Sequence, residues 1–278
     1  GIANFANGTA NTAQFDLPAG VAVDSSGNIY VADESNHRIR KITPADRIED
    51  RMVSTFAGTG TEGFANGAAT TAQFNDLTDV AVDSSGNVYV ADGNNHRIRK
   101  ITPADRIEDR MVSTIAGSGE RGFADGSGAE AQFDHPFGVA VDSSDNVYVA
   151  DTNNHRIRKI TPTRMVSTFA GTGTSGFVNG IGSTAQFNTP TGVVVDSRGN
   201  VYVADHVNHR IRKITPADRI EDRMVSTIAG SGERGFAEGT GTEAEFYGPH
   251  GMAVDSSGNV YVADESNHRI RKITPADK

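Results

Sequence analysis

The feature that most constrains this chain is a tandem repeat that fills it. The string Asn-His-Arg-Ile-Arg-Lys occurs five times, and its histidines are spaced by 59, 59, 54 and 59 residues. Residues 21–60 and 80–119 agree at 35 of 40 positions. The shorter third interval reflects the loss of five residues after Thr161-Pro162. Because a fixed period of this kind is typical of stacked repeats, each copy should form one supersecondary unit.

Each unit contains four strand-like pieces. In the first unit they are Gly-Val-Ala-Val-Asp (20–24), Ile-Tyr-Val-Ala-Asp (29–33), Arg-Ile-Arg-Lys-Ile (38–42) and Val-Ser-Thr-Phe-Ala-Gly (53–58). The pieces are rich in β-branched residues and are bounded by Gly, Pro, Asn and Asp, which is typical of short strands. Only residues 44–51 have room for a helical turn, and no apolar stripe of helical period is present. Four strands per unit at this period predict a propeller blade.

The recurring string P-x-G-V-A-V-D-S-S-G-N-V-Y-V-A-D-x-x-N-H-R-I-R-K-I resembles the NHL repeat family. The third signature position holds Arg in every copy, where the family name has Leu. Propellers of that family commonly have six blades, but five copies predict five. We predict an all-β fold: one β-propeller of five NHL-type, four-stranded antiparallel blades, in a single domain spanning residues 1–278. Its units are approximately 1–60, 61–119, 120–173, 174–232 and 233–278.

The fourth strand piece appears only four times, at 53–58, 112–117, 166–171 and 225–230. The last blade is therefore predicted to lack its outer strand and to expose the edge of Arg269–Ile273. An open edge is a template for pairing with another chain. Three interpretations remain open: the chain is part of a longer array, it forms a homo-oligomer through this edge, or Ile2–Phe5 covers the gap.

The composition and net charge exclude or disfavour several kinds of chemistry and several classes of binding partner. The chain has no Cys, which excludes disulfides, cysteine-ligated zinc and thiol catalysis. Its 26 Lys and Arg against 35 Asp and Glu give a net charge of −9, which disfavours nucleic acid and anionic membranes. No apolar run approaches the roughly 18 residues of a spanning helix. We expect no nucleic-acid partner and no membrane insertion, and no signal peptide in the printed sequence. The resemblance implies a secreted or cell-surface bacterial location.

The turn after the second strand recurs in every unit and is interpreted as structural. In the first unit it contains Asp33, Asn36, His37 and Arg38, whose side chains can bond turn backbone or carbonyls. The functional alternative is a ring of histidines that binds a metal, but turns of different blades lie on a wide circle. The Asp-Ser-Ser-Gly-Asn turn is likewise interpreted as a hairpin turn rather than a calcium loop.

The near-identical copies differ most in two places, the loop before the first strand and the turn after the second strand. Because successive strands alternate direction, both lie on one face of a propeller, here called the loop face. We take as candidate ligand-binding residues Leu17, Asp76, Asp79, His135, Phe137, Thr191, His206, Tyr247 and His250. Such residues on a rigid scaffold suit a polar small ligand, peptide or glycan, and the alternative is neutral drift. Asp79 replaces a Gly, so its loop must differ in conformation or be strained.

These observations favour a non-catalytic scaffold that presents the loop face to a protein, peptide or glycan. We expect no catalytic residues, no cofactor and no metal. One alternative is a metal-dependent lyase or hydrolase with its ion in the central channel. Its ligands would be the loop-face residues His135, His206, His250, Asp76 and Asp79. Another is an engineered or fragmentary repeat propeller with no selected ligand, which assembles through its open edge.

Overall fold

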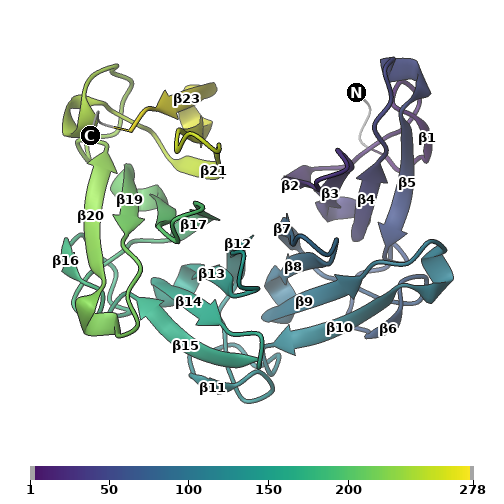
Figure 1. The fold of residues 1–278 in the computed structure, drawn as a ribbon, viewed down its shortest axis with the longest axis horizontal. Helices are drawn as coiled ribbons and strands as arrows, with labels where there is room; N and C mark the ends of the chain where they lie inside the picture. The colour runs from purple at the N-terminus through teal and green to yellow at the C-terminus, as the bar shows by residue number, and fades with distance from the viewer. Residues whose placement is uncertain (1–3, 276–278) are drawn as a thin grey trace. The chain divides into compact units, whose positions relative to one another are not determined.

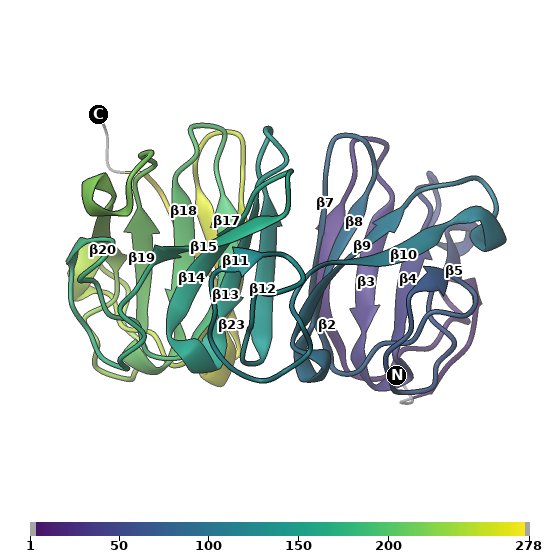
Figure 2. The ribbon, with the colours of Figure 1, turned by 90° about the horizontal axis from the view of Figure 1, so that it is seen from below.

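The computed structural model describes residues 4–275 and shows a five-bladed β-propeller in which every blade is one antiparallel sheet. The chain divides into two compact units, Gly1–Val139 and Ala140–Lys278, and each is considered by itself. Figure 1 shows the strands of each blade side by side, and Figure 2 gives the same ribbon from below. The prediction of an all-β propeller with five blades is confirmed.

The strands of the five blades have closely similar bounds. The first blade contains β1 (Gly8–Thr9), β2 (Pro18–Val23), β3 (Ile29–Asp33), β4 (Arg38–Ile42) and β5 (Met52–Ala57). The second contains β6 (Gly67–Ala68), β7 (Leu77–Val82), β8 (Val88–Asp92), β9 (Arg97–Thr102) and β10 (Met111–Ala116). The third contains β11 (Gly126–Ser127), β12 (Pro136–Val141), β13 (Val147–Asp151), β14 (Arg156–Ile160) and β15 (Met165–Ala170). The fourth contains β16 (Gly180–Ile181), β17 (Pro190–Val195), β18 (Val201–Asp205), β19 (Arg210–Ile214) and β20 (Met224–Ala229). The fifth contains β21 (Pro249–Val254), β22 (Val260–Asp264) and β23 (Arg269–Ile273).

Four blades have one strand more than the sequence predicts. Their order is the one seen in the first blade, β1-β5-β4-β3-β2, so a two-residue strand borders the predicted four. This short strand lies in the Gly-rich connection and pairs Gly8 with Val53. The last sheet has the order β21-β22-β23, and in the described residues no strand pairs with the outer edge of β23. The predicted loss of the outer strand is therefore confirmed.

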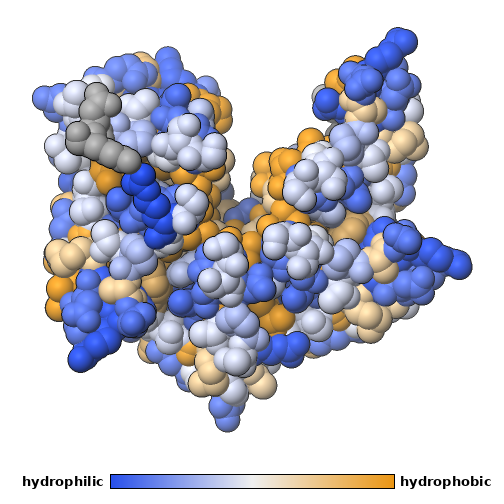
Figure 3. Space-filling view, viewed as in Figure 1, coloured by the Kyte–Doolittle hydropathy of each residue, from blue (hydrophilic) through white to orange (hydrophobic). Residues whose placement is uncertain are grey.

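Apart from isolated β-bridges, the other secondary structure in the described residues is short 3-10 turns. One kind follows the second strand of each blade: η1 (Glu34–Asn36), η3 (Gly93–Asn95), η5 (Thr152–Asn154), η6 (His206–Asn208) and η9 (Glu265–Asn267). Another precedes the fourth strand: η2 (Ile48–Asp50), η4 (Ile107–Asp109) and η7 (Ile220–Asp222). One turn, η8 (Gly241–Glu243), precedes β21. Between β14 and β15 the connection is only residues 161–164 and has no such turn. Figure 3 shows hydrophilic side chains over the connections that contain η2, η4 and η7.

The core forms where the facing sides of neighbouring sheets meet. In the first unit, Tyr30 and Phe56 of the first blade are buried in one cluster with Phe74 and Val80 of the second. Such β-branched and aromatic side chains contribute about 1.5–3 kcal/mol each when fully buried. At the start of the array, Val21 of β2 is 61% exposed, whereas its counterpart Val80 is 3% exposed. Packing against a preceding sheet, and not the identity of the residue, therefore sets burial here.

Candidate functional site

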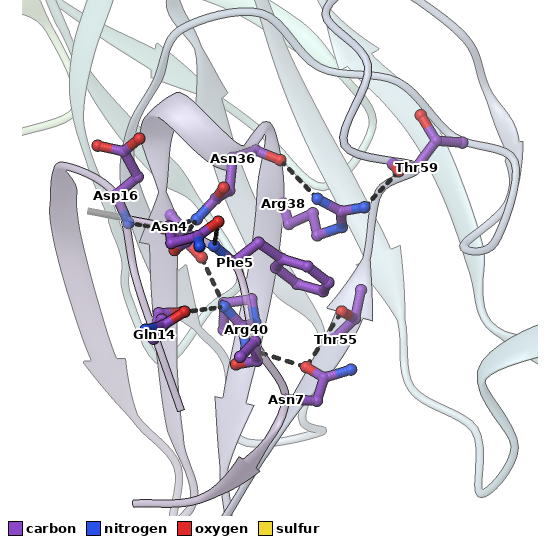
Figure 4. Close-up of polar contacts among 12 residues, drawn as sticks. Asn4, Phe5, Asn7, Gln14, Asp16, Asn36, Arg38, Arg40, Thr55 and Thr59 are labelled. Carbon is purple, nitrogen blue, oxygen red and sulfur yellow. Dashed lines mark hydrogen bonds and ion pairs between the residues drawn. The ribbon is translucent and has the colours of Figure 1, made fainter. Parts of the chain in front are cut away.

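Each blade contains a buried ion pair that ties its Gly-rich connection to its sheet. In the first blade, Arg40 donates to Asp33 at 2.7 Å, and both side chains are fully buried. The same guanidinium donates to the carbonyls of Ala6 and Gln14 at 2.8 and 3.0 Å (Figure 4). Equivalent pairs join Arg99 to Asp92, Arg158 to Asp151, Arg212 to Asp205 and Arg271 to Asp264. These charged groups are buried and bind other groups of the fold, so they are not accessible to a ligand.

The first arginine of the repeat, Arg38, binds the turn itself. It donates to the carbonyls of Asn36 and Thr59 at 3.2 and 2.6 Å and lies 3.9 Å from the centre of the Phe5 ring (Figure 4). Gly60, which follows Thr59, has a φ of 87°, a conformation that residues with a Cβ rarely adopt, which explains the glycine. The structure thus gives Arg38 to carbonyls, while Arg40, which the sequence did not single out, pairs with Asp33.

The repeated histidine joins successive blades. Its Nδ1 accepts the backbone N–H of the next blade's first loop, from His135 to His96 at 3.1 Å and from Gly248 to His209 at 3.2 Å. Burial lowers the pKa of His96 and of His209, which keeps the ring neutral and able to accept. The Asn36 amide of the same turn donates to Asp33 and to the carbonyl of Asn4. The Asp, Asn and Arg side chains of the turn are therefore engaged within the fold, as is the histidine of the second and fourth blades.

In the first unit the structure brings together three loop-face candidates. Asp76 Oδ2 lies 2.8 Å from His135 Nε2, and both side chains are partly exposed. This hydrogen bond lowers the pKa of Asp76 and raises the pKa of His135. The ring of Phe137 stacks on that of His135 at 6.4 Å. Glu34 of η1 also contacts Asp76. Burial and the negative charge of Asp76 raise the pKa of Glu34. The cluster can hold a proton between two carboxyl groups and an imidazole.

In the second unit another group forms around two histidines. The rings of His206 and His250 lie 5.8 Å apart, and His206 Nδ1 is 3.2 Å from the carbonyl of Pro249. Burial lowers the pKa of His250. Tyr247 is 38% exposed and packs edge-on against His209 at 5.7 Å. These rings form an aromatic surface.

Thr191 lies next to the second group and shares the Pro249 carbonyl with His206, whereas Leu17 belongs to neither group. Thr191 is 4% exposed and donates its hydroxyl to the carbonyl of Pro249 at 3.3 Å, so it supports the loop from beneath. Leu17 is 64% exposed at a left-handed position. Left-handed backbone recurs at this place in all five first loops, at Leu17, Asp76, His135, Thr189 and Gly248.

Asp79 is directed into the packing between blades. Its carboxylate accepts the N–H of Val80 at 2.8 Å and the N–H of Val139 at 3.0 Å. Burial of the carboxyl raises the pKa of Asp79 to about 7. The predicted difference in conformation is a difference in pairing: Asp79 pairs with Ala91, whereas the ladder of the first blade skips this position. Its φ is not in the left-handed region.

The described residues contain no cluster of side chains that could bind a metal ion. Among residues 4–275, no group of three or more His, Asp or Glu side chains is placed to hold an ion. In the Asp-Ser-Ser-Gly-Asn turn, Asp24 is already used, because it accepts from the N–H groups of Ser26 and Asn28 and from the hydroxyl of Tyr30. Across the same residues, no helix has the length and apolarity to cross a membrane.

Two features of the structure were not predicted from the sequence: a side chain that contacts Asp76, and a cavity. Glu34 lies in the variable turn after the second strand but was not among the candidates, and its contact with Asp76 follows from the way two blades pack. A cavity of about 780 Å³ lies in the second unit between β23, residues 238–241 and the side chain of Ile228. The missing fourth strand was the available signal for this cavity.

Five similar sheets, each with a buried Arg–Asp pair and a left-handed histidine, define a propeller built from one repeated blade. The NHL repeat model matches residues 15–42, 74–101, 133–160, 187–214 and 246–273, which together are half of the chain. The chain belongs to the NHL repeat family.

Two curated relatives and one solved structure illustrate the similarity. The chain is 30% identical over 289 residues to Protein SUPPRESSOR OF QUENCHING 1, chloroplastic, of Arabidopsis thaliana, covering 98% of this chain and 26% of that protein. It is 29% identical to human NHL repeat-containing protein 2, covering 95% of this chain and 40% of that protein. An auxiliary nutrient binding protein from Bacteroides ovatus superposes with a TM-score of 0.70 at 20% identity, over 96% of this chain and 61% of that one. The chain thus spans less than half of the two curated relatives.

Proposed function

We propose that this propeller is a non-catalytic scaffold whose loop face binds a protein, peptide or glycan. The observation that carries the proposal is the cluster of Glu34, Asp76 and His135, which come from three successive blades and remain partly exposed. The recurrent turn residues, in contrast, are engaged by the fold. Binding surfaces commonly consist of polar side chains that a rigid scaffold holds in place but that do not stabilise the fold themselves.

The chemistry of this cluster favours a partner that donates hydrogen bonds. Asp76 and Glu34 are acceptors, and the ring of Phe137 beside His135 offers an apolar face. A lysine or arginine side chain, or the hydroxyls of a sugar, would meet these groups directly. No step of bond making or breaking is proposed, since no described group is placed as nucleophile beside a base.

Arrays of immobilised peptides and glycans provide the test. Hits of the wild-type chain are compared with those of Asp76→Asn combined with His135→Gln, and with Glu221→Gln as a control. Glu221 is exposed and pairs with Arg219 in the connection before β20. We expect the double variant to lose at least tenfold in affinity for the retained ligands while the control keeps it. Equal binding by all three proteins, or no retained ligand on either array, would contradict the proposal.

The predicted homo-oligomer through Arg269–Ile273 stays a prediction. In its favour, β23 has β22 on one edge and no partner on the other within the described residues. Light scattering of the purified chain at several concentrations measures it directly.

A further inference from the structure

One arginine of the second unit lacks the counter-ion that its counterpart in another blade has. Arg121 and Arg234 hold the same place in their Gly-rich connections, and the backbone of each bridges the phenylalanine that precedes the next blade's first loop. Arg121 Nε donates to Asp134 at 2.9 Å. In the place of Asp134 the later loop has Tyr247, and within residues 4–275 no carboxylate forms an ion pair with Arg234. The guanidinium of Arg234 is therefore a cation that the fold leaves without an acid.

Arg234 and Tyr247 form a cationic and aromatic pair on the surface. The guanidinium carbon lies 5.9 Å from the centre of the Tyr247 ring, and both residues are exposed. From beneath, the ring of His209 packs edge-on against Tyr247 and accepts the N–H of Gly248 at its Nδ1. These contacts fix the tyrosine ring beside the charge while its outer side stays open to solvent.

The glycine beside this pair lets polar groups of two blades converge. The other four first loops have a side chain at this left-handed position: Leu17, Asp76, His135 and Thr189. A Cβ at Gly248 would lie 3.0 Å from Cε1 of His206 and 3.4 Å from Oγ of Ser266. The backbone N–H of Ser266 donates to the carbonyl of Tyr247 at 3.1 Å. An imidazole from η6 and a hydroxyl from η9 thus stand next to the tyrosine.

The polar groups gathered here both donate and accept hydrogen bonds. His206 Nδ1 lies 3.2 Å from the carbonyl of Pro249. Because a carbonyl only accepts, the neutral ring has its proton on Nδ1 and an acceptor at Nε2. The hydroxyls of Ser266 and Tyr247 can do either, whereas Arg234 only donates and is charged. A carboxylate of a peptide would use the donors alone. A sugar ring with one carboxylate and several hydroxyls would use the whole set.

The surrounding charges favour a ligand with few negative groups. Glu233 and Glu265 are exposed, and their negative charges act on Arg210 and on His250, respectively. The whole chain has a net charge of −9. Since charges beyond about 8–10 Å are largely screened at physiological salt, one carboxylate is attracted locally by Arg234. A long polyanion would meet the negative charge of the rest of the chain.

We propose that Arg234, Tyr247, His206 and Ser266 form a binding site for a single uronate residue of a glycan. The guanidinium binds the carboxylate, and the tyrosine ring lies against the C–H face of the sugar. The imidazole and the two hydroxyls bind sugar hydroxyls. This inference rests on the proposed role of the loop face in binding, but it shares no residue with the acidic cluster of the first unit.

Calorimetric titration with short oligosaccharides tests the site. The probes are di- and trisaccharides that contain one glucuronate, galacturonate or mannuronate residue. Each is paired with its methyl ester, which keeps the sugar and removes the charge. The protein variants are Arg234→Ser and Tyr247→Asp. Ser175 and Asp134 hold these two positions in other copies, so both changes reproduce arrangements that the fold already contains.

We expect at least one uronate probe to bind and to lose at least tenfold in affinity on esterification. Arg234→Ser should cause a loss of the same size, because it removes the cation. Tyr247→Asp should do so as well, since it supplies the counter-ion that Arg121 has in Asp134. Arg121→Ser is the matched control and should keep the wild-type affinity within twofold.

Three results would overturn the inference: no binding of any uronate probe, equal affinity for the esters, or unchanged affinity in Arg234→Ser. A tetrapeptide of glutamate that binds more tightly than every uronate, and is lost in Arg234→Ser, would assign the site to an acidic peptide instead. If the uronates fail while array ligands that depend on Asp76 and His135 are retained, this inference is wrong and the proposed function of the loop face stands.

Discussion

Five histidines, one in each blade, adopt a left-handed backbone with φ between 48° and 54°. A non-glycine residue in this region costs roughly 1–2 kcal/mol unless its side chain is held locally. In His96 and His209 the ring nitrogen accepts an N–H from the next blade, which offsets that cost. In these copies the residue therefore both closes a turn and joins two sheets.

Asp145 offers a test of backbone strain within one turn type. It has φ of 60° at a position where Gly27, Gly86, Gly199 and Gly258 have φ of 79° to 84°. Since glycine adopts this region without a Cβ clash, we expect Asp145→Gly to raise the free energy of unfolding by about 0.5–1 kcal/mol. Urea denaturation measures the change. The mirror variant Gly86→Asp should lose a similar amount, and a stabilising effect of Gly86→Asp would contradict the argument.

Asp79 should make stability depend on pH. Its pKa is raised by burial to about 7 in the folded chain, against an ordinary 3.8, so the folded state binds the proton more tightly than the unfolded state. The stabilisation is then present below pH 4 and is lost as pH rises through 7, by up to about 1.4 kcal/mol per pH unit. Asp79→Gly removes this group and restores the residue of the other copies. The melting temperature of the variant relative to wild type should increase from pH 5 to pH 8, and parallel profiles would refute the assignment.

At the scale of strands and turns, local sequence was sufficient for most of the fold. The Val-Tyr-Val-Ala-Asp and Arg-Ile-Arg-Lys-Ile pieces became β8 and β9, and the expected helical turn in residues 44–51 is η2. The two-residue strands were not predicted, because a segment such as Gly67–Ala68 carries no pattern of its own and pairs only once β10 is placed.

The candidate site was less predictable than the strands. The loop that holds Asp76 was identified, but its contacts with Glu34 and His135 depend on the angle between successive blades. The same dependence turned Asp79 and Thr191 toward neighbouring backbone, to which both side chains are hydrogen-bonded. Comparison of repeat copies finds positions that vary, and only packing tells which of them face out.

The end of the array provides a matched pair of isoleucines. Ile98 of β9 is fully buried, while Ile270 of β23, the same residue of the same repeat, is 73% exposed. We expect Ile98→Ala to lower the free energy of unfolding by about 2–5 kcal/mol through transfer and cavity terms. Ile270→Ala should change it by less than about 0.5 kcal/mol. Chemical denaturation of both variants measures the difference, and equal losses would show that a further contact covers Ile270.

At the scale of the whole chain, stability should follow the position of each blade in the series. In repeat proteins each unit is stabilised mainly by its immediate neighbours. Among the described residues the fifth blade has three strands and a cavity beside β23, whereas the second has five strands and a buried core on β8. Blades of nearly the same sequence are therefore expected to differ in local stability.

Hydrogen exchange can measure this difference with an internal standard. β8 and β22 have the identical sequence Val-Tyr-Val-Ala-Asp, so their intrinsic exchange rates are the same. We expect the amides of β22 and β23 to exchange at least tenfold faster than those of β8 and β9, because sub-global opening of the last blade breaks fewer contacts. Mass spectrometry of peptic fragments resolves the two regions. Equal protection would mean that the last blade is completed in solution.

The four-residue connection between β14 and β15 has a consequence for how such a repetitive chain finds its pairing. Near-identical strands can mispair, since a fourth strand of one blade matches the third strand of any other. Closing the loop of residues 161–164 costs less chain entropy than closing that of residues 215–223, by about 0.7 kcal/mol. The hairpin of β14 and β15 is thereby favoured to form early with its own partner. The deletion in this one copy therefore distinguishes one hairpin from the other near-identical ones. The remaining strands can then pair in the correct order on either side of it.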